Sequence, residues 1–278
     1  MSESGKNRRD RAAAARDAAN ASEKRRERMV RIIGAITVLV VVIGIIGVAV
    51  VVKSQSSSDA SAPSTGATPD PSAPVPKTAL PADDANAFGV PHGTGTADVP
   101  TLVIWEDFQC PACDAVEKAN GTGITQLAEE GKVNLIWRPT TFLDRNLGND
   151  SSERATAAWG CAIDAGKAKE YHSTVFNNQP EEGVGYTDET LIKFATDAGI
   201  TGGALDTFTK CYNDRKYLPW AANSAAIFYA DGVQGTPFAT LNGVEVPSAT
   251  LADKTLLDNL VAEATTTMAS ASASPSAS

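Results

Sequence analysis

Two of the four cysteines of the chain stand close together in the segment Trp105-Glu-Asp-Phe-Gln-Cys-Pro-Ala-Cys113. It overlaps the apolar run Thr101–Glu106, which predicts a buried strand, and Pro111 fits the first turn of a helix, where its missing N–H costs nothing. The Cys110 sulfur would then face free backbone N–H groups and the positive end of the helix dipole, which favour a thiolate. Cys113 follows one helical turn later, close enough to form a disulfide with Cys110 or to attack a mixed disulfide. The spacing therefore predicts a redox-active dithiol.

The same C-x-x-C pair is compatible with three further roles, which stay open. Half of a zinc site would need a second pair of ligands, yet Cys161 and Cys211 stand alone and the chain has only two histidines. A dithiol can also hold copper(I), or it can be an ordinary structural disulfide. We expect no metal centre and no cofactor beyond the redox disulfide, since no stretch resembles a phosphate-binding glycine loop either.

The patterns around this stretch predict an α/β domain with an inserted helical subdomain. Val133–Arg138 predicts a second strand. Pro237–Leu241 and Val244–Val246 predict a hairpin around the turn Asn242-Gly243. Between the second strand and the hairpin the signals are helical, from about 150 to 231. One helix is predicted to begin near Cys110. Six further helices are predicted over 151–165, 168–176, 187–195, 205–212, 220–230 and 251–264.

The stretch Trp105–Cys113 resembles the active site of DsbA-like thiol–disulfide oxidoreductases of the thioredoxin fold, above all the membrane-anchored members from actinobacteria. Gly235-Thr236-Pro237 is similar to the cis-proline loop of that family, and the inserted helices are similar to its helical domain. The resemblance covers roughly 88–266 and implies four catalytic residues, which are the nucleophile Cys110, its partner Cys113, and Thr236 and Pro237, which would face the disulfide and hold an extended client backbone. From the residues alone, Pro237 could simply begin a strand.

The chain departs from that family at two places near the dithiol. Many thioredoxin-fold enzymes have a buried acid six residues before the first cysteine, where this chain has Ile104. We infer Glu106 and Asp107 as neighbouring substitutes, with Glu106 either a proton relay or a solvated or structural residue. Between the cysteines, Ala112 follows Pro111 where the strongly oxidising type has histidine. One source of thiolate stabilisation is therefore missing, and the redox potential stays open.

Aromatic side chains flank both motifs. Phe108 and Phe238 could line an apolar groove that accepts unfolded client chains, or they could belong to the core. We expect His172, one of the two histidines, to lie on a helix surface, since Glu170 is two residues away and points elsewhere on a helix. We therefore place it outside the catalytic machinery.

The other two cysteines, Cys161 and Cys211, both fall in the predicted helical block. In an oxidising compartment they predict a structural disulfide that links one helix to another. Closing a loop of about 50 residues would contribute about 4 kcal/mol on the chain-entropy model. Two buried free thiols are the alternative.

A membrane segment precedes the domain. Ile32–Val52 is 21 residues without a charge, and at ~1.5 Å per residue it spans about 30 Å, which predicts a single transmembrane helix. A signal peptide cleaved near Ala60-Ser61-Ala62, or a buried core element, is the alternative. Residues 1–31 hold ten Lys and Arg against five acids, which predicts a cytoplasmic arm. Residues from 53 onward would then face the outer, oxidising side.

Composition divides the remainder of the chain. Residues 53–82 form a Ser-, Ala- and Pro-rich stretch that predicts a disordered stalk, and 267–278 predict a disordered tail. One domain of ordinary size lies between them, over 83–266. The chain carries a formal net charge of −9 even though its first 31 residues are basic, so the domain is strongly acidic. It is therefore not expected to bind nucleic acid.

These patterns converge on a single-pass membrane protein whose extracytoplasmic domain introduces disulfides into reduced or unfolded exported proteins. The resemblance implies that a quinone-linked membrane oxidase of the DsbB or vitamin-K-epoxide-reductase type reoxidises it. A reductase or isomerase on the same fold is the first alternative, and redox potential would separate the two. A non-enzymatic module that binds copper(I) or client proteins is the second.

Overall fold

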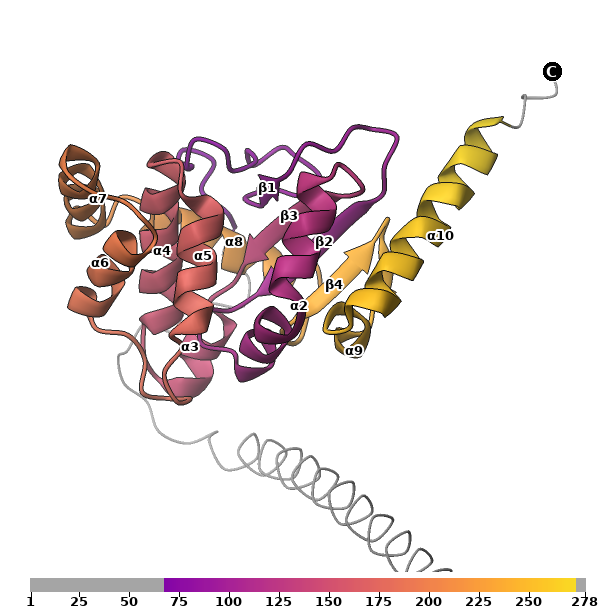
Figure 1. Ribbon diagram of the computed structural model, residues 1–278. Coiled ribbons are helices and arrows are strands. Elements are labelled where there is room, and N and C mark those ends of the chain that lie inside the picture. Colours follow the sequence, from indigo (N-terminus) through magenta and orange to yellow (C-terminus); the bar gives the residue numbers. More distant parts are fainter. Residues whose placement is uncertain (1–67, 274–278) are drawn as a thin grey trace, which may run out of the picture. The chain divides into compact units, whose positions relative to one another are not determined.

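The computed structural model describes residues 68–273 of the chain (Figure 1). The predicted arm 1–31, the predicted transmembrane segment 32–52 and the beginning of the stalk, 53–67, lie outside the described residues, as do 274–278. Within the described part, no helix combines the length and the apolar character needed to cross a membrane.

A five-stranded mixed sheet forms the centre of the described domain. Its strands are β1 (Val90–His92), β2 (Thr101–Glu106), β3 (Asn134–Pro139), β4 (Phe238–Leu241) and β5 (Val244–Val246). Their order across the sheet is β1-β3-β2-β4-β5. β2 runs parallel to β3 and antiparallel to β4, and the two outer strands pair antiparallel with their neighbours. The strand that leads to the dithiol is therefore the central one.

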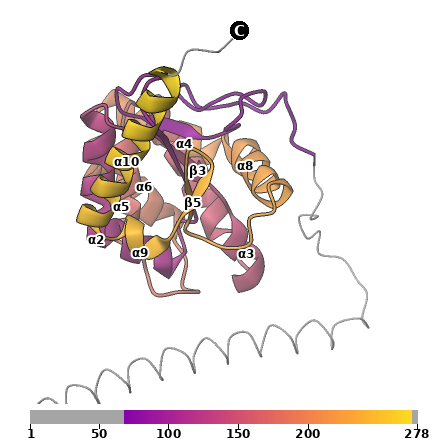
Figure 2. The same cartoon turned by 90° about the vertical axis from the view of Figure 1, so that its right-hand side faces the viewer.

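Helices cover both faces of this sheet (Figure 2). On one face lie α2 (Pro111–Glu129), α9 (Ser248–Leu251) and α10 (Lys254–Ala273), and on the other lie α3 (Phe142–Leu147) and α8 (Leu218–Ala230). The rest of the helical block consists of α4 (Ser151–Asp164), α5 (Ala168–Asn177), α6 (Asp188–Asp197) and α7 (Gly203–Asn213). α4 packs against α5, α7 and α8, and α5 packs against α2. The helical block thus reaches the helix that carries the dithiol.

The predicted α/β order with a helical insertion is confirmed, with three differences at the level of elements. The insertion begins earlier than predicted, because the short helix α3 precedes it, and β1 was not predicted. The predicted helix 251–264 is divided into α9 and α10, since Asp253 accepts hydrogen bonds from the backbone N–H groups of Thr255 and Leu256 and so starts a new helix.

The prediction of a disordered stalk is wrong for 68–82, which lie against the domain. Asn223 on α8 exchanges two hydrogen bonds of 2.9 and 2.7 Å with the backbone of Asp70. Asp164 at the end of α4 accepts the backbone N–H of Lys77 at 3.1 Å. These segment-to-domain hydrogen bonds order a stretch that has little apolar surface of its own to bury.

The prediction of a disordered tail is wrong for 267–273, which continue α10. Alanine is the strongest helix former and recurs at positions 269, 271 and 273, and the hydroxyls of Thr267 and Ser270 are satisfied within the helix by carbonyls four residues earlier. The helix therefore continues although its outer face is polar.

A disulfide joins Cys161 on α4 to Cys211 on α7, with the two Cα atoms 5.9 Å apart. The predicted structural disulfide is therefore present, and the alternative of two free thiols is not observed. The bond links two helices of the insertion that are 50 residues apart in sequence.

Candidate active site

Cys110 and Cys113 lie where β2 leads into α2. Cys110 is the N-cap residue of the helix with extended backbone angles, and Pro111 occupies the first turn, as the sequence predicts. Both cysteines are free thiols, with 6% and 0% of their surfaces exposed. Pro111 and Ala112 are exposed between them, so the dipeptide marks the side from which a partner can approach the Cys110 sulfur.

The two thiols have opposite acidity. The pKa of Cys110 falls from 9.0 to about 6, mainly because the Cys113 thiol donates a hydrogen bond to its sulfur. The backbone N–H groups of Ala112 and Cys113 contribute as well, against the effect of burial. Burial raises the pKa of Cys113 well above its ordinary value. At neutral pH the pair therefore holds one thiolate, on Cys110, and one proton, on Cys113.

The loop before β4 closes the other side of the dithiol. The peptide bond between Thr236 and Pro237 is cis, as the family resemblance implies. The Cys110 sulfur lies 3.3 Å from the carbonyl oxygen of Thr236, to which it donates when it carries its proton. The register pairs Phe238 with Trp105, so this loop runs beside the loop that leads to Cys110. Thr236, Pro237 and Phe238 are all partly exposed.

Asp107 holds the loop between β2 and α2 in place. Its carboxylate is fully buried and accepts the backbone N–H groups of Gln109 and Leu143, each at 2.9 Å, and the hydroxyl of Ser152. Burial raises the pKa of Asp107 to about 7. All three hydrogen bonds of the Asp107 carboxylate go to backbone N–H groups or to Ser152 on α4. The carboxylate therefore supports the loop and does not face Cys110.

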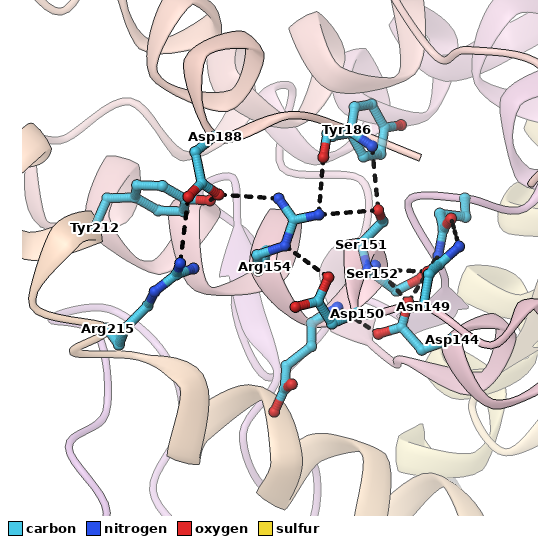
Figure 3. A network of polar contacts seen from close by, with 12 residues as sticks. Asp144, Asn149, Asp150, Ser151, Ser152, Arg154, Tyr186, Asp188, Tyr212 and Arg215 are labelled. Carbon is cyan, nitrogen blue, oxygen red and sulfur yellow. Dashed lines mark hydrogen bonds and ion pairs between the residues drawn. The ribbon is translucent and has the colours of Figure 1, made fainter. Parts of the chain in front are cut away.

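The helical insertion holds the same loop through further polar contacts. Gln109 donates to Asp144 at 2.7 Å, and Asp144 also accepts the backbone N–H of Ser152. Figure 3 shows this network continuing from Ser151 to Arg154, whose guanidinium binds Ser151 at 3.2 Å. The network joins the loop 107–110, called the dithiol loop below, to the first turn of α4.

Two side chains from the segment after α5 bind the carbonyls of the dithiol loop. Tyr186 donates its hydroxyl to the carbonyl of Phe108 at 2.6 Å. Gln179 donates to the carbonyls of Phe108 and Cys110 at 2.9 and 3.1 Å. Neither residue was predicted from the sequence. No local motif marks them, because they bind the loop from 71 and 78 residues away in the sequence.

The prediction that Phe108 lines a client groove is wrong. Only 3% of its surface is exposed, and its ring packs against Trp159, His172 and Phe176. The aromatic side of the insertion covers it, so it belongs to the core. Phe238 is partly exposed and packs at the edge of a cluster around Trp105, and its role in a groove stays a prediction.

The expectation for His172 is also wrong, since only 2% of its surface is exposed. Its Nε2 lies 2.9 Å from a carboxylate oxygen of Glu106, which is 5% exposed. A sequence signal existed, because His172 stands four residues before Phe176 and next to Tyr171, on the apolar face of its helix. Glu106 is therefore a buried acid, and a solvated role for it is excluded.

A third side chain, Glu117, completes a buried polar cluster with Glu106 and His172. Burial raises the pKa of both glutamates to about 8 and lowers that of His172. The donor atoms of the three lie within 4.8 Å of one another, close enough to surround a metal ion. Hydrogen bonds among the three side chains account for this spacing, so we treat the cluster as an acid–base group rather than a metal centre.

Comparisons with known proteins match this geometry. Residues 89–259 match the family model described as Thioredoxin. MdbA, a thiol–disulfide oxidoreductase from Actinomyces oris, is 23% identical, with a TM-score of 0.56 over 68% of this chain and 92% of its own, and shows the same fold. Reduced DsbA from Mycobacterium tuberculosis is 25% identical, with a TM-score of 0.50 over 64% of this chain and 100% of its own. The disulfide bond oxidoreductase DsbG from the same organism is also 25% identical, with a TM-score of 0.50 over 64% and 94%. No curated protein sequence matches the chain.

Proposed function

Because the chain belongs to the thioredoxin family, and its structural neighbours are thiol–disulfide oxidoreductases of the DsbA and MdbA type, we propose that this enzyme introduces disulfides into exported proteins. Cys110 and Cys113 are the redox pair of the proposal. No metal or organic cofactor takes part in it, since the disulfide itself accepts the electrons.

One observation carries the oxidising direction. The acidity of Cys110, with a pKa of about 6, stabilises the reduced enzyme, in which that sulfur is a thiolate. When the reduced form of a dithiol–disulfide couple is stabilised, its disulfide is easily reduced and therefore oxidises other thiols. The hydrogen bond from Cys113 and the N–H groups at the start of α2 thus stabilise the Cys110 thiolate, although position 112 holds alanine and not histidine.

The proposed reaction has two exchange steps. A client thiolate attacks the Cys110 sulfur of the oxidised enzyme, the bond to Cys113 breaks, and Cys113 leaves with the electron pair and takes up a proton. A second client thiolate then attacks the client sulfur of this mixed disulfide and releases Cys110 as a thiolate. The client loses two electrons and two thiol protons, and the enzyme is left reduced with one thiolate and one thiol.

The cis-proline loop is the proposed client-binding edge. Thr236 and Pro237 are partly exposed, and the Thr236 carbonyl lies beside the Cys110 sulfur. An extended client segment could pair with this backbone and bring its cysteine to Cys110, as in strand addition to a sheet edge. Phe238 would contact apolar client side chains.

The proposed location is the outer side of the cell membrane. It rests on the sequence of 32–52, which would anchor the chain in the lipid bilayer as a single transmembrane helix, and on the basic arm 1–31, which would stay in the cytoplasm. The Cys161–Cys211 disulfide supports an oxidising compartment. A membrane oxidase of the DsbB or vitamin-K-epoxide-reductase type would reoxidise the dithiol there. Membrane fractionation checks the anchor, because the full chain should sediment with membranes and a chain lacking 1–52 should not.

Oxidative refolding of a reduced model client tests the activity. We expect Cys110→Ser to abolish disulfide formation. Cys113→Ser, incubated with the oxidised client, should accumulate a mixed disulfide, because its Cys110 thiolate attacks the client disulfide, one client sulfur leaves as a thiolate, and no second enzyme thiol resolves the bond that has formed. Ala115→Ser, an exposed change on the same helix, should behave as the native enzyme. Unchanged refolding yields with Cys110→Ser would overturn the proposal. The equilibrium with glutathione distinguishes an oxidase from the alternative reductase. A potential of about −270 mV for the Cys110–Cys113 couple indicates a reductant, and one of about −120 mV indicates an oxidant.

A further inference from the structure

Gln179 joins the end of α5 to the loop that carries Cys110. Its backbone N–H closes the last turn of α5 by donating to the carbonyl of Phe176 at 3.2 Å. Pro180, which follows it, favours an extended backbone at Gln179. The ring of Phe176 packs against that of Phe108, with the two centroids 5.2 Å apart. The end of α5 therefore meets the dithiol loop through an apolar contact, and this contact brings Gln179 to the loop.

The side-chain amide of Gln179 bridges two carbonyls of the dithiol loop. Its Nε2 donates to the carbonyl of Phe108 at 2.9 Å and to the carbonyl of Cys110 at 3.1 Å. A primary amide has two N–H groups, so it can serve both carbonyls at once. Among the described residues, no other side chain binds the Cys110 carbonyl. The helical insertion thus holds the backbone on both sides of the reactive cysteine through one uncharged group.

The peptide between Cys110 and Pro111 depends on this contact more than its neighbours do. Proline has no N–H, so the Cys110 carbonyl is the only hydrogen-bonding group of that peptide. It accepts the N–H of Asp114 within α2 at 3.1 Å and the amide of Gln179 from outside the helix. The plane of this peptide sets the direction in which α2 begins, and with it the direction of the free N–H groups of the first turn.

The acidity of Cys110 depends on that direction. Hydrogen bonds from the Cys113 thiol and from the N–H groups of Ala112 and Cys113 lower the pKa of Cys110, and all these donors belong to the first turn of α2. A hydrogen bond weakens steeply when its donor turns away from the acceptor. Burial acts on Cys110 in the opposite direction. A first turn that tilts away from the sulfur would therefore leave the thiolate less stable.

Tyr186 supports the same loop without reaching this peptide. Its hydroxyl donates to the carbonyl of Phe108 at 2.6 Å. Figure 3 shows the backbone of Tyr186 held by Ser151, which accepts its N–H, and by Arg154, which donates to its carbonyl. Its hydroxyl does not bind the carbonyl of Cys110. General support of the loop and positioning of the helix start therefore come from different side chains.

We propose that Gln179 is a positioning residue of the redox pair, which holds the Cys110–Pro111 peptide so that the first turn of α2 faces the Cys110 sulfur. The inference rests on the proposed thiol–disulfide exchange and deepens it. Gln179 itself exchanges neither protons nor electrons. It makes the enzyme a stronger oxidant, because the thiolate that the first turn stabilises is present only in the reduced form. The helical insertion thus contributes to the redox potential through a neutral amide.

Gln179→Met tests this role, because it removes the amide and keeps the length of the side chain. Tyr186 still donates to the Phe108 carbonyl, and Asp114 still donates to the Cys110 carbonyl, so each keeps a partner and the variant should fold. In the reduced variant, the midpoint for alkylation of Cys110 should rise by about one pH unit above the native value of about 6. At pH 7 this shift moves the equilibrium with glutathione about fivefold towards the oxidised enzyme.

Three further variants complete the experiment. Gln179→Glu keeps the shape of the side chain but replaces the donor with an oxygen, and it should raise the midpoint at least as far as Gln179→Met. Tyr186→Phe removes a bond to the Phe108 carbonyl alone and should shift the midpoint clearly less. Gln126→Met is the same substitution at an exposed position of α2 and should keep both native values.

Two results would overturn the inference. One is a native alkylation midpoint in both Gln179 variants. The other is an equal shift in Tyr186→Phe and Gln179→Met, which would mean that Gln179 only supports the loop in a general way. Alkylation and the glutathione equilibrium need no client, so they test the positioning role even if the enzyme oxidises none.

Discussion

The two cysteines of the redox pair lie three residues apart on one helix and differ in acidity because their surroundings differ. The Cys110 sulfur sits at the helix start, where it accepts hydrogen bonds, whereas Cys113 is fully buried and donates one. The hydrogen bond between them stabilises the thiolate of one and the thiol of the other. A client can therefore attack only Cys110, and the leaving sulfur is the one that needs a proton.

Position 112 offers a test of how far this acidity can be tuned. Ala112→His would add a partly charged imidazole at an exposed site beside Cys110. We expect the pKa of Cys110 to fall by about one unit below its value of about 6, and the couple to become more oxidising. The rate of alkylation across pH measures the first effect and the glutathione equilibrium the second.

Ala115→His is the matched control, because it is exposed on the same helix but a turn farther along. It should leave both quantities at their native values. A Cys110 pKa that stays the same in Ala112→His would mean that the hydrogen bonds alone already set the acidity.

At the scale of elements, the helical insertion supports the dithiol loop as well as covering the sheet. Gln179 and Tyr186 bind the loop carbonyls, and Ser152 binds the Asp107 carboxylate beneath it. α5 adds the histidine that contacts Glu106. Moving the insertion would therefore disturb the geometry of the redox pair.

The disulfide between α4 and α7 makes a separate prediction. The double variant Cys161→Ala with Cys211→Ala should lower the free energy of unfolding by about 4 kcal/mol on the chain-entropy model, measured by chemical denaturation of the oxidised protein. The pKa of Cys110 should not change, because neither cysteine contacts the dithiol loop. An unchanged unfolding midpoint would contradict the structural role of this disulfide.

Local motifs made most of the site predictable. The C-x-x-C pair at a strand–helix junction and the Thr236–Pro237 loop can each be recognised from residues that are adjacent in the sequence. The strands and the helical insertion are predicted by the periodicity of apolar residues. Glu117 and His172 could not be placed in the same way, because packing of α5 against α2 and β2 brings them together. For Phe108 the sequence left a groove and the core as alternatives, because a sequence does not reveal that the insertion folds over this residue.

The length of the ordered part was also underestimated from sequence. Residues 68–82 have little apolar surface, yet Asn223 and Asp164 anchor their backbone to the helical block. Those hydrogen bonds order residues 68–82 only in the folded domain, and the amino-acid composition of the segment does not reveal them. Low complexity therefore predicted disorder where the chain is ordered.

For the molecule as a whole, the acidity of Cys110 links stability to redox state. Its folded pKa of about 6 lies below the ordinary 9.0, so the stabilisation is fully present above pH 9 and is lost as pH falls through 6. Only the reduced enzyme has this thiol. Its stability relative to the oxidised form should therefore rise between pH 6 and pH 9, by on the order of 3 kcal/mol.

Thermal unfolding of both redox forms across this pH range measures that difference. The acids Glu106, Asp107 and Glu117 titrate in both forms, with folded pKa values of about 8, 7 and 8. They make each form less stable as pH rises, and comparing the two forms removes most of that effect. A difference in stability that does not vary with pH would contradict the assignment.

The most direct test of the account is the pH titration of the Cys110 thiol in the reduced enzyme. Its rate of reaction with an alkylating reagent should follow a single thiolate with a midpoint at about pH 6, while the buried Cys113 stays unmodified. A midpoint near 9, the ordinary value of a cysteine, would contradict the claim that the start of α2 and the Cys113 thiol together make Cys110 acidic enough to drive oxidation.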